Sequence, residues 1–546
     1  MSFRDAIGTI RALGHDLIWI DSLCIIQDDE QDWQRESSRM ASTYRHAALT
    51  IAVTRAMNSE MGCFPPIGGS PYIWISRSGD SGASEYLTSG PNDKWKFIHI
   101  QHPKLWVPFA VTIGRCSRHF ILRPGHDLRS LQHEGEYGNW ATNIKQSNYP
   151  LLSCAWPYQE RMLSPQIVHF GPNEIAWECC EAFWSKSYGA EYRHVDEAIP
   201  YRDQEMRRRR ISKDGDYAGR INVANSHKGE FPIERARRML ISLMDEELPR
   251  SRLLKSLGLK RYEECRNSDL KIELLRKTWH RIIEEFTRLN ITFEMDRLPA
   301  LSGLASAVSA SFQSLHDGDI NIPTPMYLAG IWSNCLPYSL LWTCSPNSRR
   351  TSKYRAPTFS WASVEGAITF QTPLTAESKK GDPVWRCEIV NRSSTPLGLD
   401  PHGQVKAGFI EVFGWTGNAT VITAGSASNG GNAIRGIIEQ DQRKPGGPEP
   451  ITRRQGFYQD ISPHPCAKDS VEITPGDEVL VLLIECEKTD RYGYRVMALV
   501  LRFTEQQHAY QRVGLICPDI QYVEGHRDLF LWPSGWFPEK RTVKII

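Results

Sequence analysis

Two carboxylates and a tryptophan near the N-terminus have the types and spacing of a candidate ligand site. Asp21 follows a short apolar run, and Trp33 and Glu36 lie three residues apart in the helical pattern that comes next. Further steps of four residues lead to Met40 and Tyr44, so these four helical side chains share one face. Because ligands in open α/β sheets bind outside the carboxyl ends of the strands, Asp21 and Glu36 are candidates to line such a site.

Each carboxylate also has a structural role open to it. An acid near the start of a helix is stabilised by the helix dipole, which accounts for Glu36 without any ligand. Asp21 is of a residue type that caps turns through its side-chain oxygen. Residue type and spacing therefore leave a structural and a functional interpretation open for both positions.

Short alternating elements are expected to position these side chains. Apolar residues at helical spacing predict a helix over about 3–13, and the run at 17–20 is typical of a strand buried on both faces. A second helix is predicted over about 32–46, followed by an apolar strand at 49–53. Because helix and strand alternate, we expect an α/β fold with a parallel sheet.

The remainder of the chain divides into three parts that differ in sequence composition. Residues 165–180 predict two strands joined by a Gly-Pro-Asn turn, and residues 193–230 are polar and charged, which indicates a linker. Helical patterns follow at 233–247 and 269–289. Beyond about residue 400 the sequence becomes β-rich, in runs at 409–415, 471–487, 494–503 and 511–516. We expect a domain over 1–161, a mixed and mainly helical region over 162–395, and a β-rich domain over 396–546.

Composition and motifs exclude several classes of protein. A formal net charge of +2 over 546 residues gives no general attraction to nucleic acid or anionic membranes. The chain has no Cys-x-x-Cys and no His-Glu-x-x-His, so no metal site is predicted. The N-terminus lacks a signal-peptide core, and no apolar stretch reaches the roughly 18 residues of a membrane span. We expect a cytoplasmic protein without a bound cofactor.

The motifs around the candidate site resemble a known family. LIWIDSLCIIQDD at 17–29, then DWQRE at 32–36, Met40 and Tyr44 resemble the signature of the fungal heterokaryon incompatibility (HET) domain. Further segments resemble motifs that accompany this domain, namely WPYQERMLSPQIVHFGPNEIAWEC, MDRLPALSGLAS, YLAGIWSNCLPYSLLW and YRAPTFSWASVEG. The resemblance implies an effector of fungal self/non-self recognition that leads to regulated cell death, with a protein partner from an incompatibility system.

The resemblance also implies a chemistry for the site. HET domains are similar in fold to Toll/interleukin-receptor (TIR) domains, some of which cleave NAD with a helix glutamate in a Trp-x-x-x-Glu context. Here Trp33 and Glu36 are one residue closer. The implied roles are Glu36 as the catalytic carboxylate, and Asp21 and Trp33 as the residues that bind NAD as a substrate. A carboxylate beside the ribose would stabilise an oxocarbenium-like transition state.

One departure from the family and one alternative accompany this interpretation. HET domains normally begin with a strand that carries a Leu-Ser-Tyr-x-Trp-Gly type motif, and no such segment precedes Ser2. We therefore expect an N-terminally truncated TIR-like or flavodoxin-like sheet. The alternative function is a non-enzymatic module that oligomerises or docks a partner, or an inactive homologue.

Overall fold

The computed structural model describes two compact units, each built from several segments of the chain. Unit 1 comprises Met1–Trp19, Ala47–Ser153 and Pro165–His194, and unit 2 comprises Ile20–His46, Cys154–Ser164 and Val195–Ile546. The described residues are 2–64, 107–113, 116–122, 150–171, 175–179, 182–185, 189–192, 237, 240, 267–316, 325–345, 348–351, 353–371, 387–423, 435–442, 451–460, 473–489, 493–517 and 537–546. The predicted linker at 193–230 and most of the predicted helix at 233–247 lie outside them.

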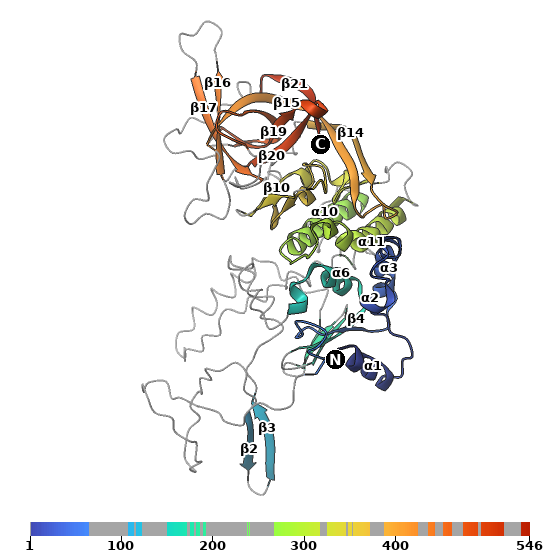
Figure 1. Ribbon diagram of the computed structural model, residues 1–546. Helices are drawn as coiled ribbons and strands as arrows, with labels where there is room; N and C mark the ends of the chain where they lie inside the picture. Colours follow the sequence, from blue (N-terminus) through green and yellow to red (C-terminus); the bar gives the residue numbers. More distant parts are fainter. Residues whose placement is uncertain are drawn as a thin grey trace, which may run out of the picture. The chain divides into compact units, whose positions relative to one another are not determined.

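Within the described residues, unit 1 contains a five-stranded mixed sheet and an α-helix at its N-terminus. The sheet has the order β1 (Thr50–Ala52), β4 (Gln166–Phe170), β5 (Ile175–Cys179), β6 (Ala182–Ser185) and β7 (Gly189–Tyr192). α1 (Ser2–Ala12) places Ala6 in a small core with Cys63 and Phe170, and β2 (Val107–Ile113) pairs with β3 (Cys116–Leu122) (Figure 1). The predicted helix at 3–13, the strand at 49–53 and the strand pair at 165–180 are confirmed.

The prediction of a parallel sheet is wrong for most of this sheet. Only β1 and β4 run parallel, with Thr50 opposite Ile167, whereas β4 to β7 are antiparallel. The connection between Phe170 and Ile175 spans four residues, a length that joins antiparallel strands but cannot make the crossover that parallel strands need. The sheet is therefore mixed.

The buried strand predicted at 17–20 is also not formed. Residues 15–20 have no regular secondary structure, and the side chain of Leu17 is 89% exposed. A strand requires a neighbour to satisfy its backbone groups, and within the described part of the sheet β1 pairs only with β4. The apolar composition of residues 17–20 does not tell whether a neighbouring strand is available to pair with them.

Among its described residues, unit 2 has the α-helices α2 (Asp21–Cys24), α3 (Glu30–His46), α6 (Ala155–Leu163), α10 (Asn267–Phe286) and α11 (Pro299–His316). α3, α6 and α11 pack against one another (Figure 1). Their contacts belong to a large apolar core that includes Tyr158, Leu301 and Leu304, with Ala41 and Tyr44 of α3 at its edge. The predicted helices at 32–46 and 269–289 are confirmed.

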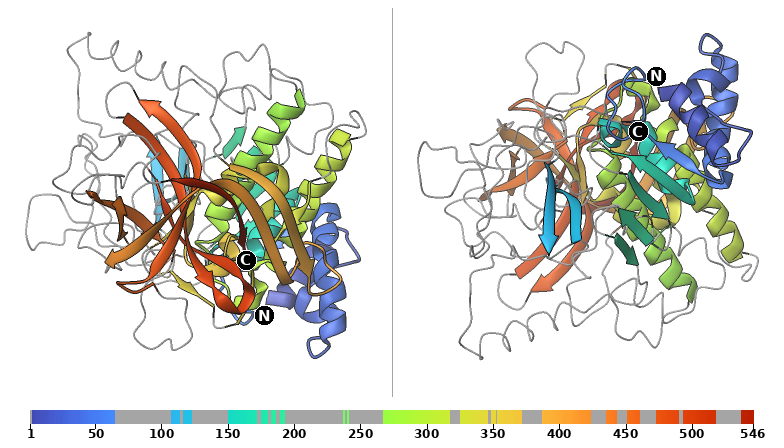
Figure 2. Two further views of the ribbon diagram at one scale, coloured as in Figure 1. Left: turned by 90° about the horizontal axis from the view of Figure 1, so that it is seen from above. Right: turned by 90° about the horizontal axis from the view of Figure 1, so that it is seen from below.

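The C-terminal region of unit 2 is a closed β-sheet, in agreement with the predicted β-rich texture. Its strands are β14 (Cys387–Pro396), β15 (Val405–Thr423), β16 (Arg435–Gln442), β17 (Ile451–Gln459), β18 (Glu478–Thr489), β19 (Gly493–Thr504), β20 (Ala509–Ile516) and β21 (Glu539–Ile545). The hydrogen-bonded order runs β15, β16, β17, β20, β19, β18 and returns to β15 (Figure 2). Closure leaves no free edge along this path.

Strand β18 is buried on both faces, which explains its continuous apolar sequence. Val479, Val481 and Leu483 belong to one core with residues of β15 and β19, whereas Leu480 and Leu482 belong to the core shared with the helices. Successive side chains of a strand point to opposite faces, so the barrel and the helical group share this strand.

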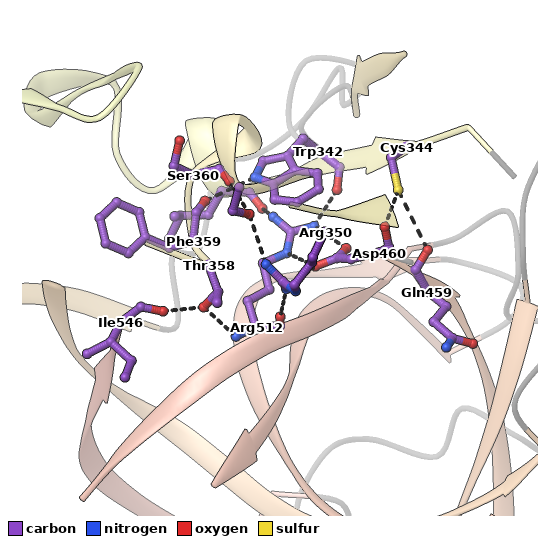
Figure 3. A network of polar contacts seen from close by, with 12 residues as sticks. Trp342, Cys344, Arg350, Thr358, Phe359, Ser360, Gln459, Asp460, Arg512 and Ile546 are labelled. Atoms are coloured by element: carbon purple, nitrogen blue, oxygen red, sulfur yellow. Dashed lines mark hydrogen bonds and ion pairs between the residues drawn. The ribbon is translucent and has the colours of Figure 1, made fainter. Parts of the chain in front are cut away.

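A segment of short strands and turns, residues 325–371, joins the helices to the barrel. Arg512 of β20 is buried there: Nη1 donates to the Leu340 carbonyl at 2.8 Å, and Nε lies 3.1 Å from Asp460 Oδ2. The guanidinium also lies 3.5 Å above the ring of Trp342 (Figure 3). The backbone of Arg512 donates to the hydroxyl of Thr358 at 2.8 Å. One arginine therefore fixes this segment to the barrel.

No helix within the described ranges combines the length and the apolar character needed to cross a membrane.

Candidate functional site

The acidic turn before α3 is part of the helix cap. The carboxylate of Asp29 accepts hydrogen bonds from the backbone N–H groups of Gln31 at 2.8 Å and Asp32 at 3.0 Å. The carboxylate of Asp32 in turn accepts the N–H of Ile26 at 2.9 Å. The contacts of Asp29 satisfy donors that the first helical turn leaves free, and the contact of Asp32 ties the preceding loop to α3.

Glu36 lies in the second turn of α3 and retains access to solvent. Its side chain is 22% exposed, and Oε1 lies 3.1 Å from Nη1 of Arg39, whose side chain is 65% exposed. Within the described residues no hydrogen bond or ion pair joins Glu36 to Asp21. The two predicted carboxylates therefore do not form one directly bonded pair.

Trp33 is half-buried and packs against α6. Its ring meets Trp156 edge to face, with the ring centroids 6.4 Å apart. The Nε1–H of Trp156 donates to Oδ2 of Asp296 at 3.4 Å. Trp33 thus anchors the start of α3, and the edge-to-face pair contributes about 0.5–1.5 kcal/mol beyond the burial of its area.

Asp21 is the first residue of α2 and is exposed. Its Oδ1 accepts the N–H of the adjacent Ser22 at 2.7 Å, and α2 has no side-chain cap hydrogen bond at its N-cap, Ile20. Its negative charge also raises the pKa of Glu160 on α6 and of Tyr44 on α3. The fold therefore places Asp21 close enough to Glu160 and Tyr44 for its charge to act on both groups.

Glu160 is a candidate functional residue to which the sequence suggested a structural role in a polar cluster with Gln159 and Arg161, and no catalytic role. Desolvation, with a smaller contribution from the charge of Asp21, raises the pKa of this carboxyl to about 7, although a hydrogen bond with Tyr44 opposes the shift. The hydroxyl of Tyr44 in turn has its pKa raised by burial and by Glu160, so it stays protonated and acts as a hydrogen-bond donor. The sequence signal was a glutamate flanked by buried positions in AWPYQERML.

The neighbouring residue in this helix has a structural function. Gln159 is 1% exposed, and its Oε1 accepts the N–H of Gly303 on α11 at 2.8 Å. Gly303 lies close to Ala41 of α3 as well, since a Cβ on Gly303 would lie 2.5 Å from the Cβ of Ala41. These contacts hold α3, α6 and α11 together beside Glu160.

The arrangement offers a proton donor or acceptor at neutral pH. A carboxyl with a pKa near 7 exchanges its proton readily at that pH, which is the property of a general acid or base. No group of three His, Cys, Asp or Glu side chains in the described part of the chain is placed to hold a metal ion. The chemistry available here is that of carboxylates, a phenol and two indoles.

Comparison with known proteins places the signature segment in a family. Residues 1–95 match the family model described as "Heterokaryon incompatibility protein (HET)". No curated protein and no solved structure matches the chain. The matched residues include Asp21, Trp33 and Glu36, so residues 1–95 of the chain carry the heterokaryon incompatibility (HET) domain match.

Proposed function

We propose that this protein is a cytoplasmic effector of fungal heterokaryon incompatibility that triggers regulated cell death after recognition of a protein partner. The family match over residues 1–95 carries this proposal, because it covers α1 to β1 and every residue of the signature. The fungal origin and the cell-death outcome come from the family that the sequence resembles.

We propose NAD cleavage as the biochemical activity, with Glu36 as the catalytic carboxylate in a TIR-like N-terminal domain. The support is that Glu36 keeps solvent access while Trp33, one turn earlier, anchors the same helix. Exposed ion pairs contribute only about 0–1 kcal/mol, so a substrate can displace Arg39 from Glu36 at little cost. Glu36 would then hydrogen-bond the ribose hydroxyls, and Asp21 and Trp33 would bind the rest of NAD.

The test is nicotinamide release from NAD by the purified full chain. We expect Glu36→Gln to abolish release, because a neutral amide does not stabilise a developing positive charge. Arg39→Met should retain release, since it frees the carboxylate from its partner. Glu388→Gln, at an exposed position of β14, is the matched acidic control. Equal release by the wild type and Glu36→Gln, or no release from the wild type, would overturn the assignment.

The second candidate is a non-enzymatic module that acts by homo-oligomerisation. The observation that favours it is the exposure of apolar signature residues in unit 2, with Leu23 62% and Ile26 61% exposed. Exposed apolar side chains that lie near one another are typical of protein interfaces. Under this alternative, Leu23→Ser with Ile26→Ser would abolish both self-association in multi-angle light scattering and the cell-death response, whereas Glu36→Gln would affect neither.

A further inference from the structure

A buried arginine just before α11 has no ionic partner. Arg297 ends the short helical turn η3 (Glu294–Arg297) and is 3% exposed. Within the described part of the chain its one hydrogen bond runs from Nη2 to the carbonyl of Gly366 at 3.4 Å, which is longer than the usual range of about 2.7–3.2 Å. Its Nε–H has no acceptor, and no carboxylate of the described residues forms an ion pair with it.

The carboxylates near Arg297 are already paired with other arginines. Glu365 Oε2 lies 2.8 Å from Nη2 of Arg349, and its Oε1 lies 3.4 Å from Nη1 of Arg355. Glu294 Oε1 lies 3.1 Å from the same Nη2 of Arg349. We call these five residues the arginine cluster: Arg297, Arg349, Arg355, Glu294 and Glu365. With three cations and two anions, the cluster has a formal net charge of +1.

Two cations of the arginine cluster are withdrawn from water. Arg355 is 2% exposed, and its Nε and Nη2 donate to the carbonyls of Ala362 at 2.6 Å and Val364 at 2.9 Å. These carbonyls satisfy its donors but do not balance its charge. Burial and the like charge of Arg355 lower the pKa of Arg297 to about 10, so Arg297 stays cationic at neutral pH. A buried cation without a counterion is unfavourable, because its charge has lost its water.

We propose that a halide ion, chloride under physiological conditions, binds at the Nε–H of Arg297 and completes the arginine cluster. One negative charge balances the net charge of +1. The Nε–H supplies a charge-assisted hydrogen bond that no other acceptor uses. A halide is compact and accepts hydrogen bonds from any direction, which suits an enclosed site. Phosphate is larger and carries more than one negative charge at neutral pH.

The proposed site links α11 to the segment 325–371. Arg297 lies directly before α11, and Arg355 lies between β11 (Arg349–Arg350) and β12 (Val364–Glu365). α11 begins two residues after Arg297, so the positive end of its helix dipole also favours an anion at this place. A bound chloride therefore stabilises the attachment of α11 to this segment.

The test is urea unfolding of the full chain in mixtures of sodium chloride and sodium gluconate at constant ionic strength, followed by far-UV circular dichroism. Gluconate is also monovalent, but it is too bulky for an enclosed site. We expect the ratio of folded to unfolded protein to rise about tenfold for each tenfold increase in chloride above the dissociation constant. The reason is that a ligand bound only by the folded state stabilises that state by mass action.

Two variants assign the chloride response to Arg297. Arg297→Gln removes the positive charge and the Nε donor, so chloride and gluconate should give the same stability. Arg39→Gln, at a side chain of α3 that is 65% exposed, is the control for general salt effects. It should keep the wild-type response to chloride.

Diffraction locates the ion without any variant, which covers the case that Arg297→Gln does not fold. Wild-type crystals grown in sodium bromide should show an anomalous peak in contact with Nε of Arg297 at the bromine absorption edge. Equal stability of the wild type in the two salts would overturn the proposal, and so would a chloride response that persists in Arg297→Gln. Absence of bromide at Arg297 would also overturn it and would assign the Nε–H to water.

Discussion

Substitution of Gly303 by alanine tests the close approach of α3 to α11. The added Cβ would lie 2.5 Å from the Cβ of Ala41 and 2.9 Å from Oε1 of Gln159, whereas carbon atoms pack at about 3.5–4.0 Å. The helices must therefore separate by about 1 Å. Such overpacking costs about 1–3 kcal/mol, and weakening the bond from Gly303 N–H to Gln159 costs about 1 kcal/mol more.

Helix propensity opposes these costs, since alanine is favoured over glycine in a helix by about 1 kcal/mol. The net expectation for Gly303→Ala is a loss of about 1–3 kcal/mol, measured by urea unfolding followed with far-UV circular dichroism. Gly8→Ala in α1 is the control for propensity, because no atom lies within 4 Å of the added Cβ. It should be neutral or stabilising.

A double-mutant cycle then isolates the contact. Ala41→Gly in the Gly303→Ala background removes the nearest clashing atom, so the double variant should be more stable than the sum of the two single changes predicts. The reasoning would be refuted if Gly303→Ala matched or exceeded the wild-type stability, or if the two changes were additive.

Two further predictions concern buried polar contacts in unit 2. Arg512→Met should destabilise the chain by about 3–5 kcal/mol in urea unfolding, because it removes the nearer cation from the buried Asp460 carboxylate, which keeps only Arg350 at 4.0 Å, and because it removes the stacking over Trp342. Tyr158→Phe should cost about 1–2 kcal/mol in the same assay, because the hydroxyl donates to Glu285 at 2.9 Å inside the helical group.

Controls separate charge burial from general disturbance. Asp460→Asn added to Arg512→Met should recover part of the loss, since the buried carboxylate that lost Arg512 is then a neutral amide, while Arg350 keeps its hydrogen bond to Ser363 at 3.0 Å. Arg39→Met, with a 65% exposed side chain, should change stability by less than about 0.5 kcal/mol. A loss in Arg512→Met no larger than in Arg39→Met would contradict the proposed role of Arg512, and wild-type stability in Tyr158→Phe would contradict that of Tyr158.

Local sequence patterns predicted most of the individual elements. Helical spacing gave α1 and α3 within about two residues of their observed bounds, and the Gly-Pro-Asn turn gave the hairpin of β4 and β5. β-branched runs gave the strands at β15, β18, β19 and β20. These signals are local, because side-chain periodicity and turn chemistry depend on a few adjacent residues. The domain boundaries at 161 and 395 stay predictions.

Contacts between segments far apart in the sequence could not be predicted from local sequence patterns. The run at 17–20 has the composition of a buried strand, yet a strand also needs a ladder partner, and composition carries no information about one. Glu160 lies 116 residues after Tyr44, and its raised pKa comes from desolvation by the fold and from Asp21 on another element. Neither the desolvation of Glu160 nor its proximity to Asp21 can be predicted from the residue spacing in AWPYQERML.

The sequence by itself determined the family of residues 1–95 and placed Trp33, Glu36, Met40 and Tyr44 near one face of a helix, because helix geometry fixes how side chains three and four residues apart are arranged. Only the tertiary structure decided what that face contacts. It buried Met40, placed Trp33 on Trp156 and Tyr44 on Glu160, and left Glu36 beside Arg39. Burial and pKa depend on which segments fold against each other, and that is a property of the whole chain.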